Sequence, residues 1–245
     1  MDQKSDIFKG KVALVTGATR GIGKSIAMML AKNGVHLLIT GRAVDKLCEI
    51  CDMAAKYGVK VHSLVADIKD PETPKILMDD LYQHFDRLDF LINNAGAGFA
   101  KSFENTTVED WDYLMNVNAK APFFVCKEAI PLLKKSDSAT IVNISSVVGR
   151  LGYELQSAYS ASKHALMGYT KVLAKELKPH NIRVHAIAPG GVATEMIDRM
   201  RPDIDPEELI KPEDVAKVVE FLLTFRGSAM IDEINLRRYT GIPWQ

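Results

Sequence analysis

Short apolar runs rich in β-branched residues alternate with longer segments of helical period along the whole chain. The short runs are nearly all continuously apolar, which is typical of strands that a parallel sheet buries on both faces. We therefore predict strands at residues 11–16, 35–40, 59–65, 89–93, 140–144, 182–188 and 229–236. Strands that alternate with helices in this way indicate an α/β fold with helices on both faces of a parallel sheet.

The first helical segment shows how the helices are delimited. Ile22, Ile26 and Leu30 recur every four residues, which places them on one face of a helix. Asn33-Gly34 then gives the signal for a left-handed cap at the end of the helix. By the same reasoning we predict helices over residues 47–58, 70–85, 122–135 and 157–178, and a last helix that begins at Pro212.

Prolines mark other boundaries. Pro179 ends the long helix over residues 157–178, whereas Pro131 lies inside the segment 122–135 and should kink or break it. The complete pattern is that of a Rossmann-like, doubly wound sheet of seven parallel strands with right-handed crossovers. We expect a single domain over residues 1–245.

Composition narrows the classes of function. Hydrophobic residues make up 47% of the chain and charged residues 25%, as in folded proteins with a sizeable core. The 31 basic and 31 acidic residues leave no net charge to attract nucleic acid or an anionic membrane, so we expect neither partner. No apolar run approaches the roughly 18 residues of a membrane span. The polar residues 1–10 lack the apolar centre of a secretory signal, and we expect a cytoplasmic protein.

The cysteines suit a reducing compartment and do not form a metal-site pattern. Three cysteines cannot all pair with one another. Cys48 and Cys51 form a single CxxC, but neither a second pair nor a suitably spaced histidine accompanies it. We interpret the two cysteines as positions on a helix and expect no metal site.

A glycine-rich segment follows the first strand. Residues 16–23 read Thr-Gly-Ala-Thr-Arg-Gly-Ile-Gly. Glycines there let the chain turn tightly and approach a pyrophosphate, which the N-terminus of the next helix stabilises. Because the spacing of Gly17, Gly21 and Gly23 differs from the usual GxGxxG, an ordinary turn is the alternative at this point.

Four further motifs follow later strands or lie in the long helix. They are Asn93-Asn94-Ala95-Gly96, Ser145-Ser146, Tyr159-Ser160-Ala161-Ser162-Lys163 and Pro189-Gly190. With the glycine segment they resemble the short-chain dehydrogenase/reductase family over residues 10–225, and within it the 3-oxoacyl-[acyl-carrier-protein] reductases most of all. Independently, open α/β sheets bind ligands just past the carboxyl ends of their strands. The candidates at such ends are Gly17, Arg42, Asp67, Asn94, Ser146 and Pro189.

Tyr159 and Lys163 are the first catalytic candidates. They are four residues apart and therefore share one face of a helix. A tyrosine pKa of about 10 is too high for acid–base catalysis near neutrality, and a nearby ammonium and an oxidised nicotinamide both favour the phenolate. The alternative is a half-buried helical tyrosine beside a solvated lysine.

Ser146 and Asn118 complete the catalytic set that the resemblance implies. Ser146 can hydrogen-bond a substrate carbonyl oxygen and stabilise the charge that develops on it, with Ser145 as the rival candidate. Asn118 matches the family residue that holds a water in a proton relay to the lysine, with Asn116 as the rival candidate.

The end of the second predicted strand indicates the cofactor. A carboxylate there would repel a 2′-phosphate, but Thr40-Gly41-Arg42 contains none. We therefore expect NADP(H), with Arg20 and Arg42 binding the phosphate from two sides. The alternative is that both are ordinary surface arginines.

The resemblance implies a larger cofactor site. Asp67 would contact adenine, Asn94 and Gly96 would line the adenosine ribose, and Thr194 would bind the nicotinamide carboxamide. The whole set is Gly17, Thr19, Arg20, Gly21, Ile22, Gly23, Arg42, Asp67, Asn94, Ala95, Gly96, Tyr159, Lys163, Pro189, Gly190, Val192 and Thr194. Residues 194–211 correspond to the family's substrate lid, and their apolar side chains suit a partly apolar substrate.

The resemblance implies an NADPH-dependent carbonyl reductase, reversible as an alcohol dehydrogenase, with Tyr159 as the proton donor. A 3-oxoacyl thioester is one candidate substrate and a small alcohol, steroid or polyol another, while an NADPH sensor without turnover is an alternative of a different class. The resemblance and the helix after Ser157 also predict a homotetramer or homodimer. Many family members end their last strand in paired glycines, whereas residues 235–239 here read Asn-Leu-Arg-Arg-Tyr.

Overall fold

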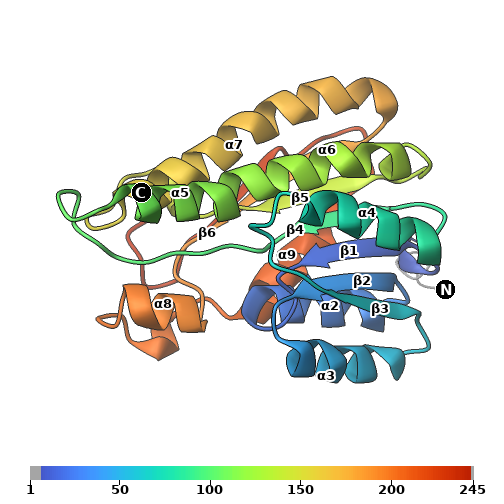
Figure 1. Ribbon diagram of the computed structural model, residues 1–245, viewed down its shortest axis with the longest axis horizontal. Helices are drawn as coiled ribbons and strands as arrows, with labels where there is room; N and C mark the ends of the chain where they lie inside the picture. The colour runs from blue at the N-terminus through green and yellow to red at the C-terminus, as the bar shows by residue number, and fades with distance from the viewer. Residues whose placement is uncertain (1–6, 244–245) are drawn as a thin grey trace.

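The computed structural model describes residues 7–243. They contain a sheet of seven parallel strands in the order β3-β2-β1-β4-β5-β6-β7, which confirms the predicted doubly wound α/β fold (Figure 1). The strands are β1 (Val12–Thr16), β2 (His36–Gly41), β3 (Val61–Val65), β4 (Phe90–Asn93), β5 (Thr140–Ile144), β6 (Arg183–Pro189) and β7 (Glu233–Leu236). Most of the polar start of the chain, where we expect no secretory signal, lies outside the described residues.

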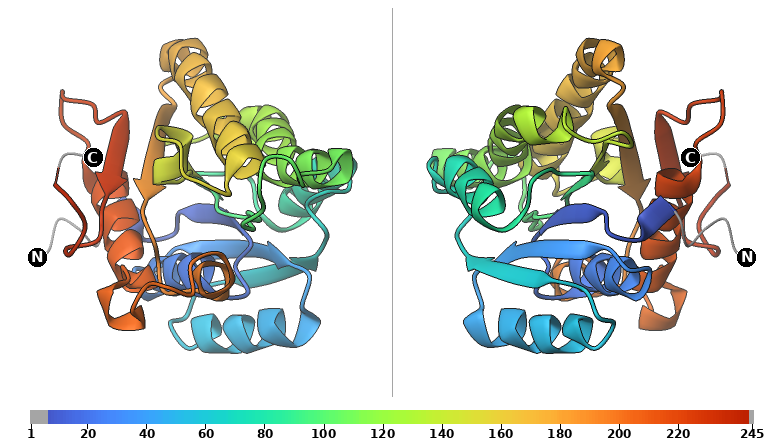
Figure 2. Two further views of the ribbon diagram at one scale, coloured as in Figure 1. Left: turned by 90° about the vertical axis from the view of Figure 1, so that its left-hand side faces the viewer. Right: turned by 90° about the vertical axis from the view of Figure 1, so that its right-hand side faces the viewer.

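Two layers of helices cover the two faces of the sheet (Figure 2). They are α2 (Gly21–Lys32), α3 (Val44–Ala55) and α9 (Pro212–Thr224) on one face, and α4 (Thr73–His84), α6 (Ala121–Leu133) and α7 (Ser157–Leu177) on the other. Successive strand side chains point to opposite faces, so Ala13 and Val15 enter one core whereas Val12 and Leu14 enter the other. Within residues 7–243, no helix is long and apolar enough to cross a bilayer.

The two edge strands are less buried than the central ones. β3 and β7 each pair with a single neighbour, and most of their side chains are only partly covered. The last strand is also shorter than the predicted segment 229–236. Its four residues pair only with residues 186–189 of β6, and the chain before Glu233 joins the sheet through the hydrogen bond from Ala186 N to Asp232 O.

Helix α6 continues through Pro131, so the prediction that this proline breaks the helix is wrong. Pro131 lies only two residues before the helix ends at Leu133. Its missing N–H and its ring affect one helical hydrogen bond, the one that Lys127 O would otherwise accept, and the rest of the helix is kept. A hydrogen bond of 3.0 Å from Lys134 N to Ile130 O carries the backbone past the proline.

Helix α5 (Val108–Met115) lies in a stretch for which we predict no element, and a π-helical turn, η1 (Asn116–Lys120), joins it directly to α6. The helix begins at a capping box, because Thr107 Oγ1 accepts a hydrogen bond from Asp110 N while Asp110 Oδ2 accepts one from Thr107 N. The four-residue Thr-x-x-Asp pattern was the available sequence signal. The short elements are η2 (Val147–Gly149), η3 (Lys178–His180), α8 (Glu195–Met200) and η4 (Pro206–Glu208).

The strand order reverses between β1 and β4. The chain winds outward from β1 through β2 to β3 and then returns to place β4 on the other side of β1. The connections that leave these two strands diverge, which opens a crevice at the carboxyl edge of the sheet. The glycine segment and the Asn-Asn-Ala-Gly motif lie at this edge.

Candidate active site

A cleft of about 590 Å³ lies at the carboxyl edge of the sheet. Each predicted cofactor-binding residue lines this cleft, as do Ser146, Tyr159 and Lys163. Asn118 is the one predicted site residue that does not reach its wall. The fold therefore brings together residues that lie up to 177 positions apart, from Gly17 to Thr194.

The glycine loop and the loop after β4 contact each other closely. Gly17 has a φ of +66°, and a Cβ at this position would lie 2.8 Å from Ala95 Cα. A Cβ at Gly23 would lie 2.2 Å from Gly17 O. Asn94 Nδ2 donates hydrogen bonds of 3.0 Å to Thr16 O and Gly17 O. These contacts require glycine and fix the two loops relative to each other.

The N-terminus of α2 faces the cleft with free donors. Arg20 occupies the N-cap position without a capping side-chain hydrogen bond, and the first turn contains no acidic residue. The first N–H groups of a helix have no partner within the helix and carry a partial positive charge. This end of α2 therefore fits a phosphate group.

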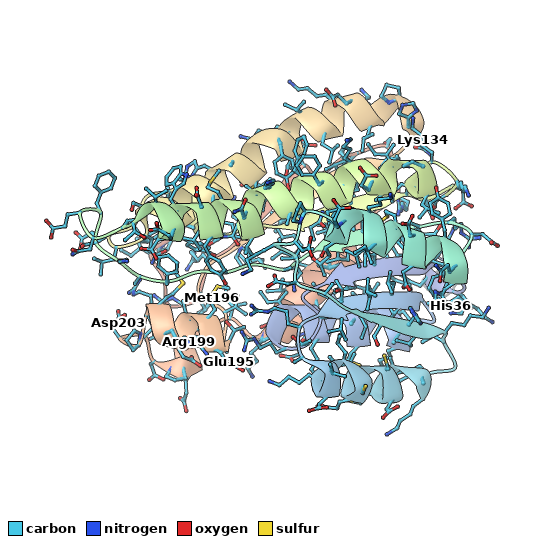
Figure 3. The ribbon with its side chains drawn as sticks, viewed as in Figure 1. His36, Lys134, Glu195, Met196, Arg199 and Asp203 are labelled. Carbon is cyan, nitrogen blue, oxygen red and sulfur yellow. The ribbon has the colours of Figure 1, made fainter. Side chains whose placement is uncertain are left out.

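The two arginines predicted to bind a 2′-phosphate have different surroundings. Arg42 lines the cleft and forms no ion pair with residues 7–243. The guanidinium of Arg20 forms an ion pair with Glu195 at the start of α8. Arg199 Nη2 and Lys46 Nζ also lie 3.7 and 4.0 Å from the Glu195 carboxylate. Figure 3 shows Glu195 and Arg199 on α8, which stands apart from the main body of the sheet.

Tyr159 and Lys163 both lie on α7 and are almost fully buried. Lys163 Nζ donates a hydrogen bond of 3.0 Å to Ile144 O, and burial lowers the pKa of Lys163 to about 8. Burial raises the pKa of Tyr159, and a side-chain hydrogen bond with Ser146 acts against this shift. In the protein alone, burial therefore decides the pKa of Tyr159, rather than the ammonium that we expected to lower it.

The structure separates Ser146 from its rival. Both serines line the cleft, but Ser146 is only partly buried there, whereas Ser145 Oγ is buried without a hydrogen-bond partner among the described residues. A Cβ at Gly149 would lie 2.7 Å from Ser145 Oγ, so this hydroxyl points beneath η2. The geometry favours Ser146 as the group that contacts a substrate.

Asn118 lies behind the wall of the cleft, in the π-helical turn. Its side-chain amide exchanges hydrogen bonds of 2.8 Å with the N–H and C=O of Ala97, and it donates to Ser162 Oγ. A Cβ at Gly96 would lie 3.3 Å from Asn118 Oδ1 and 3.6 Å from Lys163 Nζ. Asn118 and Lys163 therefore lie on either side of the space at Gly96, whereas Asn116 lines a separate, smaller pocket, and Asn118 holds the loop after β4 against α7. The water relay stays a prediction.

The sequence profile of the short chain dehydrogenase family matches residues 11–205. The chain belongs to this family. It is 38% identical over 236 residues to the 3-oxoacyl-[acyl-carrier-protein] reductase FabG of Aquifex aeolicus, covering 93% of this chain and 95% of that protein. It is also 38% identical over 237 residues to the hydroxynaphthalene reductase-like protein Arp2 of Metarhizium anisopliae, covering 87% and 88%.

A solved structure agrees with the sequence relatives. A short chain dehydrogenase from Escherichia coli, crystallised with NADPH, is 31% identical and superposes with a TM-score of 0.88 over 95% of this chain and 98% of that one. This likeness extends over the whole sheet and both helical layers. Our chain is therefore an oxidoreductase of the short-chain dehydrogenase family.

Sequence reasoning missed one wall of the cleft in this short-chain dehydrogenase. The missed lining residues are Tyr113, Tyr153, Gln156, Arg201, Arg237, Arg238, Thr240, Gly241 and Ile242. The only signal in the sequence was the Asn-Leu-Arg-Arg-Tyr segment in the place of paired glycines.

A group of possible metal ligands lies outside the cleft. His62 Nε2 and His84 Nδ1 lie 3.1 and 3.8 Å from Asp80 Oδ1. The two imidazole rings stack with centroids 3.7 Å apart and planes inclined by 22°, so their lone pairs do not converge on one point. Cys48 and Cys51 both lie on α3, as interpreted from the sequence, and are free thiols. The expectation of no metal site stays a prediction.

Proposed function

We propose that this short-chain dehydrogenase is an NADPH-dependent carbonyl reductase that also runs in reverse as an alcohol dehydrogenase. The observation that carries the proposal is that Ser146 lines the same cleft as the buried side chains of Tyr159 and Lys163. Burial keeps the proton on Tyr159 at neutral pH but also makes the hydroxyl a weak acid. A nearby ammonium and an oxidised nicotinamide favour the phenolate, so they would help Tyr159 to give up this proton. Proton donation is what carbonyl reduction requires.

The side chains of this chain divide the chemistry. Ser146 donates a hydrogen bond to the carbonyl oxygen and orients it, while Tyr159 gives that oxygen its proton. Lys163 lies one helical turn after the tyrosine on α7, and it would tune Tyr159 and bind the nicotinamide ribose. NADPH supplies the hydride when it is bound.

Three features support NADP(H) as the cofactor. The second strand ends in Gly41-Arg42 without a carboxylate, Arg20 flanks the glycine loop, and the N-terminus of α2 has unpaired N–H groups. Guanidinium groups match the geometry of phosphate oxygens. The NADPH complex of the Escherichia coli structure supports the same cofactor here.

The substrate class stays open between two candidates. Relatives with equal identity carry the names of a 3-oxoacyl carrier-protein reductase and a hydroxynaphthalene reductase-like protein. A 3-oxoacyl thioester is our first proposal, and a small alcohol, steroid or polyol is the second. The apolar side chains of Met196, Ile197 and Met200 in the proposed lid, residues 194–211, line the cleft and suit a partly apolar chain.

Replacement of Tyr159 by Phe tests the proposed function against an NADPH sensor without turnover. Removal of the hydroxyl should lower kcat for a ketone panel by about a hundred- to ten-thousandfold, because it deletes the general acid, while NADPH affinity changes little. Steady-state turnover and NADPH fluorescence titration measure the two effects. The matched control is Tyr57→Phe, an exposed tyrosine beyond the end of α3.

Wild-type turnover in Tyr159→Phe would refute the mechanism. Firm NADPH binding by the parent protein without reduction of any carbonyl would favour the sensor instead.

We also propose that the chain acts as one domain that assembles into a cytoplasmic homodimer or homotetramer. Trp111 on α5, Phe123 and Phe124 on α6 and Val172 on α7 are exposed although they are large and apolar. A subunit contact would cover such side chains. Light scattering at micromolar concentration tests this assembly, and a monomer mass would contradict it.

A further inference from the structure

The segment after β7 is attached directly to the catalytic cleft. Gly190 N donates a hydrogen bond of 2.7 Å to Leu236 O. A Cβ at Gly190 would lie 3.9 Å from both Arg237 Cα and Arg238 N. Arg237 and Arg238 therefore stand beside the turn after β6, at the end of the cleft where the family resemblance puts the nicotinamide.

Three arginines, Arg201, Arg237 and Arg238, line the rim of the cleft and give it an excess of positive charge. Arg238 Nη1 lies 2.9 Å from Glu208 Oε2, and Arg201 forms a two-pronged ion pair of 2.7 and 2.8 Å with Asp203. Arg237 has no carboxylate partner within residues 7–243, although it lines the same cleft. Three guanidinium groups thus face two carboxylates, and the unbalanced charge belongs to Arg237.

The guanidinium of Arg237 is held in place on one side only. Its Nη1 donates to three main-chain oxygens of the turn that follows, those of Arg238, Tyr239 and Gly241, at 3.0, 3.0 and 2.7 Å. Its Nε and Nη2 donors bond no group among the described residues. A guanidinium presents its donors as a fixed planar fork, so the bonds at Nη1 also fix the direction of the free donors.

We propose that Arg237 binds an anionic group of the substrate, a carboxylate or a phosphate, while Ser146 and Tyr159 act on its carbonyl. The inference rests on the proposed function and specifies its substrate class. Charge-assisted contacts from a pre-oriented guanidinium are among the stronger polar interactions in proteins. The competing interpretation is that Arg237 only stabilises the turn over residues 238–241.

Matched acids and esters separate these interpretations. Acetoacetate and levulinate are compared with their methyl esters, and acetoacetyl-CoA supplies the phosphate-bearing arm. The parent protein should prefer the acid over the ester, or the CoA thioester over the neutral ester, by about ten- to a hundredfold in kcat/KM. Which of the two preferences is found identifies the carboxylate or the phosphate as the anion.

The variants test Arg237 itself. Arg237→Gln should remove the preference, mainly through KM for the anionic substrate, while the neutral ester is reduced as before. Arg237→Lys keeps the charge and should retain part of the preference. The matched control is Lys56→Gln, which removes one exposed positive charge outside the cleft and should leave the preference unchanged.

Each contrary outcome has one meaning. Equal losses for acid and ester in Arg237→Gln would show that the arginine only stabilises the turn, and a parent without any anion preference would also overturn the inference. Both results leave the carbonyl reductase intact. If the parent protein reduces no carbonyl, the proposed function fails. The inference is then tested separately, by whether acetoacetate or CoA stabilises the NADPH complex against unfolding. Absence of any stabilisation that depends on Arg237 would overturn it.

Discussion

The part of the cleft that we propose for the cofactor and the part that we propose for the substrate, called here the cofactor half and the substrate half, are held together by different interactions. In the cofactor half, the loops after β1 and β4 are packed main chain against main chain, with Gly17 and Gly23 at contacts that admit no Cβ. In the substrate half, main-chain hydrogen bonds among the described residues hold residues 194–211 and 237–242 only near the ends of these segments, at Ile210 and beside Gly190. Between these points the contacts are surface ion pairs: Arg20 with Glu195 links α8 to the glycine loop, and Arg238 with Glu208 links the two segments to each other.

This difference indicates which half can move. Each exposed ion pair contributes only about 0–1 kcal/mol to the stability of the folded protein, and dissolved salt weakens it further. A close main-chain contact cannot be separated without loss of its hydrogen bonds and packing. The substrate half can therefore open for substrate and product, while the cofactor half keeps its shape.

The largest effect should follow from Gly23→Ala, which attacks the rigid half. The added Cβ would lie 2.2 Å from Gly17 O and 2.5 Å from Asn94 Nδ2, so both loops must shift. We expect NADPH affinity to fall by about ten- to a hundredfold, because the loops that would bind the cofactor must carry the roughly 1–3 kcal/mol of strain of an overpacked site. The free energy of unfolding should fall by about 1–3 kcal/mol, as for other overpacked sites.

Gly227→Ala is the matched control, because no atom lies within 4 Å of a Cβ at that loop position. Fluorescence titration and thermal unfolding measure both variants. Equal effects of the two substitutions would show that the close contact at Gly23 is not what shapes the cofactor site.

Substitutions of Arg42, Arg20 and Glu195 should have effects of intermediate size on the preference for NADPH over NADH. Arg42→Gln should reduce the preference for NADPH over NADH by about ten- to a hundredfold, since Arg42 is free to bind the 2′-phosphate. Arg20→Gln should have a smaller effect, because Glu195 competes for its guanidinium. Glu195→Gln should raise the preference. Ratios of kcat/KM for the two cofactors measure all three variants.

Two results would contradict this account of the arginines. One is equal kcat/KM for NADPH and NADH in the parent protein. The other is a larger loss of preference in Arg20→Gln than in Arg42→Gln.

The smallest effect should follow from Glu208→Gln in the substrate half. Glu208 Oε2 accepts from Arg238 Nη1 at 2.9 Å and from Thr240 Oγ1 at 3.0 Å, which links η4 to the segment after β7. Loss of the charge should cost less than about 1 kcal/mol of stability and raise KM for a ketone by about fivefold at most. Its neighbour Glu207, which is exposed and forms no ion pair within residues 7–243, is the control as Glu207→Gln. A loss of several kcal/mol would show that the substrate half is as rigid as the cofactor half.

The sequence predicted the parts of the protein that depend on local pattern. Continuously apolar runs identified the central strands, and glycines and polar residues just past strand ends identified residues that line the cleft. Tyr159 and Lys163 could be paired because a helix brings residues four apart to one face. Short-range geometry determines such features, so the sequence was sufficient for them.

Only the tertiary structure decided the features that depend on distant segments. It paired Arg20 with Glu195 and placed Asn118 behind the wall of the cleft rather than in it. It also brought Arg237 and Arg238 to the rim of the cleft beside Gly190. It let α6 pass through Pro131, because the proline removes only one helical hydrogen bond and the packed helix continues beyond it. Side-chain charge and burial depend on which chain segments meet in space, and no local pattern in the sequence encodes that meeting.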